Sequence, residues 1–160
     1  MKRIICLVLL ILLLCGCSKE DMATFYYRPV DYLTDHNGPV LSAETRNITG
    51  YTENPHFLVS LYLTGPLDKD LQSPFPKGTR LQSLINKDRQ LTVQLYDLPQ
   101  NLSDAEFSLA CACLTMTCME FFDVDSVTII CGNRSVSMDQ SILTLSDSPT
   151  TIQSSDGGTS

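Results

Sequence analysis

The stretch SDAEFSLACACLTMTCMEF, residues 103–121, decides the fold more than any other part of the chain. Ser103 and Glu106 have the spacing of a capping box, in which each side chain binds the backbone N–H group of the other residue. A helix is therefore expected to begin here. Apolar residues then recur three or four positions apart, at Phe107, Ala110, Cys111, Leu114, Cys118 and Phe121. This period places them on one side of the helix, which is predicted to cover the core.

The segments on either side of this helix have the pattern of strands. Residues 91–95 alternate apolar and polar side chains, and together with residues 79–86 they predict a hairpin. Residues 127–131 alternate in the same way, and a turn at 132–133 leads to a short return strand at 135–137. The long helix is thus predicted to lie between a hairpin and a closing strand.

The earlier part of the chain predicts two more strands and a second helix. Phe25-Tyr26-Tyr27 has high strand propensity, residues 40–48 form the next strand, and the polar residues 35–38 between them form a turn. Asn54 and Pro55 are typical of a helix start, and Gly65-Pro66 of its end. Residues 67–78 are predicted to be a loop, in which Asp68 and Asp70 are solvated.

The first residues have the pattern of a secretory signal. Lys2 and Arg3 precede an apolar run over residues 4–14, and Gly16 comes directly before Cys17. The run is shorter than the roughly 20 apolar residues that a spanning helix needs. The stretch resembles a bacterial lipobox, which implies cleavage between Gly16 and Cys17 and a diacylglyceryl group on the Cys17 thiol. An ordinary signal peptide with an incidental cysteine is the alternative.

These patterns divide the chain into four parts. Residues 1–16 are predicted to be a lipoprotein signal peptide, and residues 17–22 a lipidated N-terminus and spacer. Residues 23–138 form a single domain. Residues 139–160 are rich in serine, threonine and aspartate and are predicted to be a disordered tail. The domain is then expected on the extracytoplasmic face of the cell membrane, held there by lipid.

The charge balance excludes two classes of partner. The chain has a formal net charge of −7, and the leader carries away Lys2 and Arg3, so the mature chain is still more acidic. Nucleic acids and anionic lipid surfaces both require a positive protein surface. We therefore expect no nucleic-acid partner, and membrane attachment through the diacylglyceryl anchor alone.

Four cysteines, Cys111, Cys113, Cys118 and Cys131, belong to the domain. On one helix Cys111 and Cys118 would lie about 10.5 Å apart along the axis, beyond the roughly 7 Å that a disulfide tolerates. Cys111 and Cys113 point to nearly opposite sides, which suits neither a bridge nor a shared metal. Small buried side chains are predicted, and a bridge from Cys131 to the helix is the alternative.

The sequence offers one candidate ion pair and no catalytic constellation. Glu44 and Arg46 lie on one face of a strand, where a structural ion pair is predicted and a contact with an anion or partner is the alternative. His36 and His56 neighbour no serine of the G-x-S-x-G kind and lack metal-ligand spacing. We therefore predict no catalytic residues, no metal and no cofactor.

The order of short motifs resembles the GerMN domain family, the module of sporulation and spore germination lipoproteins. The resemblance covers residues 23–138, and it depends on the order and spacing of the motifs rather than on any one of them. They are Phe25-Tyr26-Tyr27, residues 41–46, Leu63-Thr64-Gly65-Pro66, Phe75-Pro76-Lys77-Gly78-Thr79, residues 91–95, the Ser103 helix with Leu114-Thr115, and residues 127–129.

The resemblance implies a small α/β domain of the α+β type. Two helices would pack on one face of a three- to four-stranded mixed sheet, similar to the ring-building modules that associate side by side in secretion and sporulation complexes. It also implies a Gram-positive-type, endospore-forming lineage, a place in the cell envelope and no established catalysis.

The expected function follows from the leader and the resemblance together. We predict a membrane-anchored, extracytoplasmic interaction or assembly domain that docks on an envelope protein or associates with itself, in sporulation, spore germination or other envelope complexes. The alternative is a ligand-binding lipoprotein that presents a small molecule or an envelope polymer.

Overall fold

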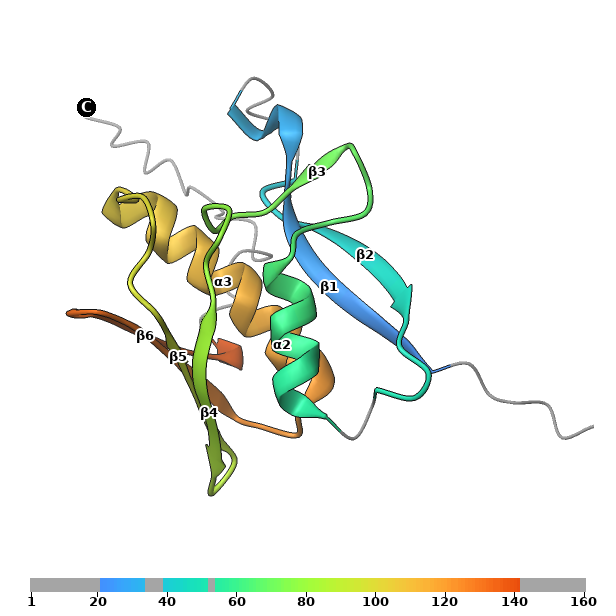
Figure 1. Ribbon diagram of the computed structural model, residues 1–160, viewed down its shortest axis with the longest axis vertical. Helices are drawn as coiled ribbons and strands as arrows, with labels where there is room; N and C mark the ends of the chain where they lie inside the picture. The colour runs from blue at the N-terminus through green and yellow to red at the C-terminus, as the bar shows by residue number, and fades with distance from the viewer. Residues whose placement is uncertain (1–20, 34–38, 52–53, 142–160) are drawn as a thin grey trace, which may run out of the picture.

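Two β-sheets lie on opposite sides of the long helix in the computed structural model, which describes residues 21–33, 39–51 and 54–141 (Figure 1). In chain order the elements are β1 (Met22–Pro29), the 3-10 helix η1 (Val30–Leu33), β2 (Ser42–Asn47), α2 (Pro55–Leu63), β3 (Leu71–Gln72), β4 (Leu81–Lys87), β5 (Gln90–Leu95), α3 (Asp104–Phe121), β6 (Ser126–Cys131) and β7 (Arg134–Asp139).

The larger sheet has four strands in the order β4-β5-β6-β7 and is mixed. β4 and β5 form an antiparallel hairpin whose turn residues, Asp88 and Arg89, both have positive φ, at 53° and 60°. Such a two-residue turn matches the twist of the flanking strands. α3 carries the chain across to β6, which pairs with β5 in parallel, and β7 returns antiparallel to β6. The hairpin, the long helix, the closing strand and the return strand are as predicted, and the structure adds that α3 is the crossover between two parallel strands.

The smaller sheet has three antiparallel strands in the order β2-β1-β3. β1 pairs with β2 over most of its length, but β3 covers only its last two residues. Further back along that side of β1, the backbone N–H of Tyr26 donates to the Thr117 hydroxyl on α3, at 2.9 Å. Thr117 also donates to the carbonyl of Cys113. One turn of α3 therefore supports the part of the β1 edge that β3 does not pair.

α3 begins at the predicted capping box and is buried on two sides. The Ser103 hydroxyl accepts from the Glu106 N–H, and the Glu106 carboxylate accepts from the Ser103 N–H. Of the predicted apolar face, all members are buried except Phe121, which is half-buried and packs edge-on against Phe25 of β1. Cys113 and Thr117 are buried as well, because β1 of the smaller sheet covers the side of α3 that a single sheet would leave in solvent.

α2 begins where predicted and lies beside α3 between the two sheets (Figure 1). The Asn54 side chain accepts from the N–H of Phe57 at 3.0 Å and caps the helix. On its inner side, the Tyr62 ring stacks on Tyr27 of β1 with centroids 5.0 Å apart. On the larger sheet α2 contacts β4. Both helices therefore contribute to a single core.

The α+β class, the two helices and the four-stranded mixed sheet confirm the predicted fold, and the structure adds the second sheet. The predicted loop over residues 67–78 contains β3, and the return strand is longer than residues 135–137. The leader with Gly16 and Cys17, the turn at 35–38 and the tail from residue 142 lie outside the described residues.

Candidate functional site

Glu44 and Arg46 form the predicted ion pair, and the structure places it inside the molecule. Both residues project from the inner face of edge strand β2, and Arg46 Nε lies 2.5 Å from a Glu44 carboxylate oxygen. The side chains are only 10% and 5% exposed, respectively. Charges that point inward from an edge strand discourage another strand from pairing there. The structure therefore contains the pair, and the sequence did not indicate that it would be buried.

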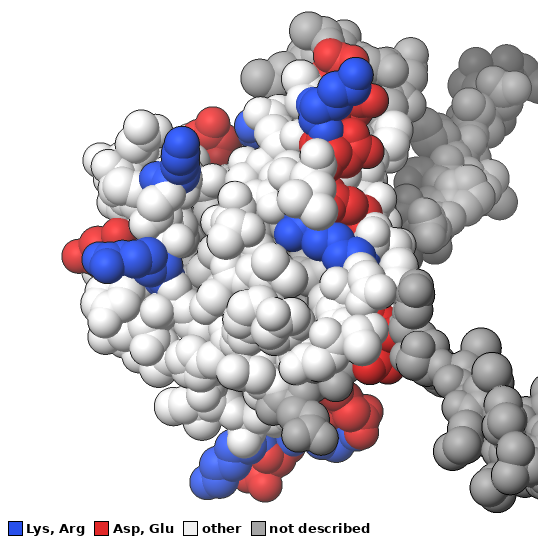
Figure 2. All heavy atoms as spheres, turned by 45° about the vertical axis from the view of Figure 1, so that its right-hand side comes forward, with Lys and Arg blue, Asp and Glu red and all other residues white. Residues whose placement is uncertain are grey.

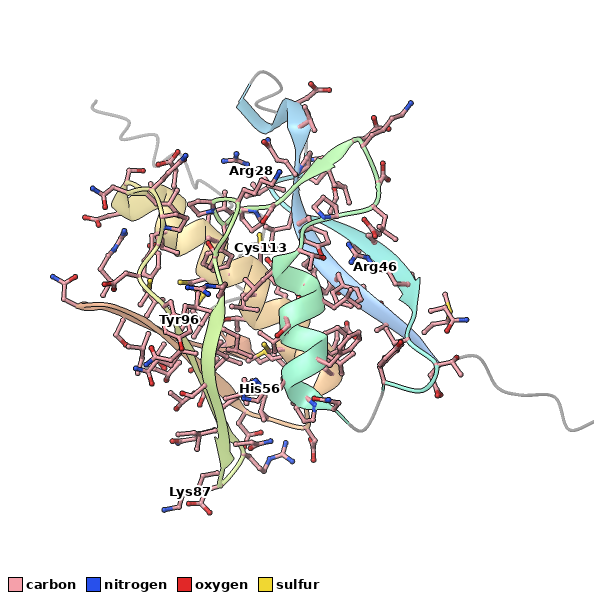
Figure 3. All side chains as sticks on the ribbon, in the orientation of Figure 1. Arg28, Arg46, His56, Lys87, Tyr96 and Cys113 are labelled. Carbon is pink, nitrogen blue, oxygen red and sulfur yellow. The ribbon has the colours of Figure 1, made fainter. Side chains whose placement is uncertain are left out.

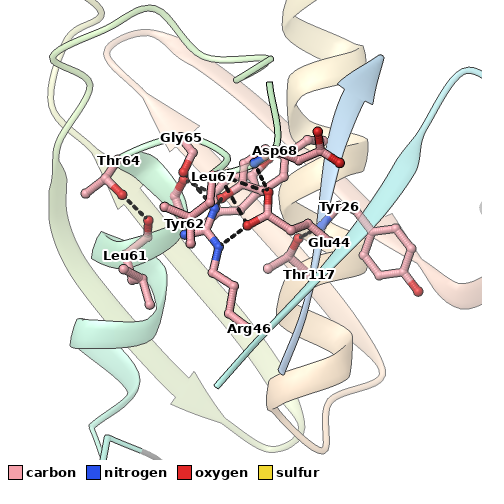
Figure 4. Close-up of polar contacts among 11 residues, drawn as sticks. Tyr26, Glu44, Arg46, Leu61, Tyr62, Thr64, Gly65, Leu67, Asp68 and Thr117 are labelled. Carbon is pink, nitrogen blue, oxygen red and sulfur yellow. Dashed lines mark hydrogen bonds and ion pairs between the residues drawn. The ribbon is translucent and has the colours of Figure 1, made fainter. Parts of the chain in front are cut away.

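The Arg46 guanidinium joins three elements (Figure 4). Its Nη2 donates to the carbonyl of Gly65 at 2.7 Å and to the Tyr27 hydroxyl at 3.0 Å. It also lies over the ring of Phe25, 4.8 Å from the centroid, where cation–π attraction adds to the hydrogen bonds. β1, β2 and the end of α2 are therefore linked through one side chain.

The Glu44 carboxylate holds the loop that follows α2. It accepts from the backbone N–H groups of Leu67, at 2.9 Å, and Asp68, at 3.0 Å (Figure 4). Burial alone would raise the pKa of Glu44, but the hydrogen bonds from Arg46, Asp68 and Leu67 together lower it below its ordinary value. The carboxylate stays charged, and the loop backbone beside it is fixed in place.

The anchored loop displays an apolar side chain to solvent. The side chain of Leu67 is 80% exposed, although its backbone N–H is bound by Glu44. Asp68 and Asp70, which follow Leu67, are exposed, and Asp68 Oδ1 accepts only from the nearby N–H of Asp70 among the described residues. The sequence correctly predicts solvated aspartates here, but it does not indicate that the backbone at Leu67 and Asp68 is bound by Glu44.

An open groove of about 860 Å³ runs along this loop. Its walls come from the end of α2, from β3 and from the segment that leads into β4. Leu63, Leu71 and Leu81 supply apolar surface, and Leu67 stands at the same groove. A hollow of this size is within the usual range for binding sites, about 300 to 1,000 Å³.

Cations border the groove. Lys69, Lys77 and Arg80 line it and are exposed, and Asp68 is the only carboxylate among the lining residues. Within the described ranges none of the three cations forms an ion pair, whereas Arg46, Arg89 and Arg134 all do. Arg80 lies over the ring of Tyr96, 5.1 Å from its centroid. The groove is therefore locally positive in a chain whose net charge is −7.

The outward side of α2 carries no charged residue. We define the α2 face as His56, Phe57, Ser60, Leu61 and Thr64, which are exposed or half-buried. The Tyr51 ring, half exposed, stacks on Phe57 with centroids 4.2 Å apart and extends this surface. Figure 2, turned toward this side, shows a broad uncharged area with charged side chains gathered at its border.

Neither histidine is placed as a catalytic base in the described structure. His36 lies outside the described residues, and His56 is exposed at the start of α2, where the described part of the chain gives it no hydrogen bond (Figure 3). Within residues 21–33, 39–51 and 54–141, no group of three or more His, Cys, Asp or Glu side chains is arranged to hold a metal.

The domain cysteines are free thiols in the core. Cys111, Cys113, Cys118 and Cys131 are all buried and unbridged, which confirms small buried side chains over a bridge to Cys131. Burial raises the pKa of the Cys111 and Cys113 thiols to about 12 and raises the pKa of Cys118 further. Thiols in this state are poor nucleophiles and poor metal ligands.

The sequence reasoning missed the cations of the groove. Lys69 and Lys77 belong to the predicted loop and Arg80 to the first predicted strand of the hairpin, and no local pattern links the three. A signal was nevertheless present, because Leu67 is an apolar residue set among Asp68, Lys69 and Asp70 rather than at core spacing. Only the fold brings β3 and the start of β4 together around it.

Comparisons with known proteins give one family and several solved structures. The model of the family described as Germane, sporulation and spore germination, matches residues 24–137. No curated protein gives a significant match. Among the described residues, no helix combines the length and hydropathy needed to cross a bilayer.

The matched structures are distant in sequence. The first GerMN domain of the sporulation protein GerM from Bacillus subtilis is 17% identical with a TM-score of 0.52, covering 72% of this chain and 86% of that one. The tandem GerMN domains of the same protein are 16% identical with a TM-score of 0.52, covering 74% of this chain and 41% of that one. A candidate lipoprotein from Clostridium perfringens is 17% identical with a TM-score of 0.48, covering 76% and 89%. At these identities the two GerM structures bear on the fold alone.

Proposed function

The chain belongs to the Germane family of sporulation and spore germination domains, and from this premise we propose that it is a lipid-anchored, extracytoplasmic docking domain. It would bind an envelope protein or a second copy of itself, in sporulation, spore germination or another envelope complex. The observation that carries this proposal is the α2 face, an uncharged surface on an acidic domain. Charged residues are depleted at the centre of protein interfaces, and aromatic residues are enriched there.

The role we propose is non-catalytic. His56 is exposed and has no hydrogen bond within the described structure, and burial raises the pKa of each domain thiol. The sequence features that place the domain outside the cytoplasm are the apolar leader and Cys17. A diacylglyceryl group supplies two acyl chains, which hold a protein at a bilayer far longer than one chain does.

Photo-cross-linking in cells tests the docking role. A photoreactive amino acid at Ser60, the exposed centre of the α2 face, should give a discrete protein adduct after illumination. The same amino acid at Gln100, exposed on the loop before α3, is the matched control and should give little adduct. Mass spectrometry of the Ser60 adduct then identifies either a partner or this chain itself. Adducts of equal yield from both positions, or none from Ser60, would contradict the proposal.

Replacing Cys17 with serine tests the anchor. Serine lacks the thiol that carries the lipid, so the variant is expected to lose lipid labelling and either to be released into the medium or to remain attached through an uncleaved leader. Metabolic labelling with a fatty-acid analogue and mass spectrometry of the N-terminus distinguish these states. Cys6→Ser, a change within the leader, is the control and should leave labelling intact. Full labelling of Cys17→Ser would exclude the assignment.

A further inference from the structure

We infer that the groove along the loop after α2 binds an extended acidic peptide segment of a partner protein, one that also carries apolar side chains. This inference deepens the proposed docking function by naming the site and the chemistry of the partner. It depends on four observations: unpaired cations, an apolar lining, two edge strands and a pinned loop.

The cations at the groove indicate that its ligand is negatively charged. Lys69, Lys77 and Arg80 border the groove without a carboxylate partner in the described residues, and Asp68 alone opposes them among the lining residues. Lys87, which also forms no ion pair in the described structure, lies at the opposite end of β4 (Figure 3). In an acidic protein, cations gathered at one hollow and left unpaired attract an anionic ligand and raise its association rate.

The apolar lining favours a peptide over a phosphate polymer. Leu63, Leu71 and Leu81 face the groove, and Leu67 adds a side chain that is 80% exposed. A chain of sugar or glycerol phosphates carries charge but has little apolar surface to bury against leucines. A peptide with acidic and apolar side chains in alternation can satisfy both the cations and the leucines, because alternate residues of an extended chain point to opposite sides.

The elements around the groove suit an extended backbone. β3 ends the smaller sheet and β4 ends the larger one, and both border the groove. Edge strands present unpaired backbone groups, to which a bound segment can add as a further strand. The groove wall is also preorganised, since Glu44 binds the N–H groups of Leu67 and Asp68 before any partner arrives. Preorganisation reduces the entropy that binding would otherwise cost.

The test uses the full chain in non-ionic detergent and fluorescence anisotropy. The probe is a short fluorescein-labelled peptide of repeated aspartate, leucine and serine, and matched probes replace its aspartates with asparagine or its leucines with serine. The acidic probe should bind, with an affinity that falls as salt is raised. Both matched probes should bind more weakly, because one lacks the charge and the other lacks the apolar contacts.

Matched protein variants locate the site. Lys77→Glu should weaken binding by about fivefold, whereas Lys87→Glu, the same charge change about 20 Å away along β4, should leave it within about twofold. Leu67→Ser should weaken binding and Ile85→Ser, which alters an exposed apolar residue of β4 outside the groove, should not. Neither lysine forms an ion pair in the described structure, so both variants should keep the circular dichroism spectrum of the parent.

Three results would overturn the inference. They are failure of the acidic probe to bind, equal losses for Lys77→Glu and Lys87→Glu, and binding of poly(glycerol phosphate) that competes with the probe and is insensitive to Leu67→Ser. The last result would assign the groove to an envelope polymer. Failure here is distinguishable from failure of the docking function. Ser60 borders the groove as well as the α2 face, so a Ser60 adduct in cells without binding of the acidic probe would reject the acidic peptide and keep the docking role.

Discussion

Replacing Arg46 with methionine is expected to lower the free energy of unfolding by about 3 to 5 kcal/mol. Methionine retains much of the apolar stem, but it leaves the Glu44 carboxylate buried without a countercharge. The Tyr27 hydroxyl and the carbonyl of Gly65 also lose their donor. Removing one member of a buried pair is costly because the remaining charge has neither water nor a partner. Urea denaturation followed by circular dichroism measures the change.

Two controls separate burial from charge. Arg89→Met breaks an exposed pair with Asp123 and Asp125 and is expected to cost far less than Arg46→Met, because water screens that pair. The double variant Glu44→Gln, Arg46→Met should recover part of the loss, because it leaves no unpaired carboxylate in the interior. A double variant whose loss equals the sum of the two single losses would show that the residues do not act as a pair.

The pH dependence of the same variant gives an independent check. Because the pKa of Glu44 is lowered in the folded state, its stabilising contribution is complete at neutral pH and is lost as the pH falls through the folded pKa. In Arg46→Met the carboxylate is buried without its partner, so its pKa should rise instead. The stability difference between parent and variant should therefore narrow below about pH 4. A difference that widens on acidification would contradict the assigned role of the pair.

The predictions that hold are those with local causes. The start of α3 depends on Ser103 and Glu106, which are three residues apart, and the start of α2 depends on Asn54 and Pro55. Capping groups act within one helical turn, so the sequence shows them directly. The β4–β5 hairpin likewise forms between residues that are close together in the sequence. The four-stranded sheet then follows, because α3 is a crossover of ordinary length between parallel strands.

The features that the sequence did not reveal depend on distant contacts. The alternation of Glu44 and Arg46 places them on one face of β2, but it cannot say that this face points inward. That outcome requires Gly65 and the N–H groups of Leu67 and Asp68 to come within reach. The second sheet also depends on distant contacts, since β3 contributes only two residues and pairs only with β1. The groove then forms between elements that no sequence period connects.

Replacing Leu114 with alanine is expected to cost about 2 to 5 kcal/mol of unfolding free energy. Leu114 is fully buried at the middle of α3, which lies between the two sheets. A helix held from both sides cannot move far toward a vacated volume, so the cavity should persist and the cost should lie in the upper part of this range. Leu109 is half-buried on the same helix. Leu109→Ala changes the helix propensity by the same amount as Leu114→Ala, and it should cost clearly less.

The comparison of these two leucines tests the arrangement of layers, because both substitutions give alanine the same advantage within a helix. The difference between their measured free energies therefore reports packing. Equal losses would mean that Leu114 is packed no more tightly than the half-buried Leu109, and that α3 is not held between the two sheets. In that case the loop pinned by Glu44, which depends on β2 staying beside β1 and the end of α2, would lack the support that makes the groove a preorganised site.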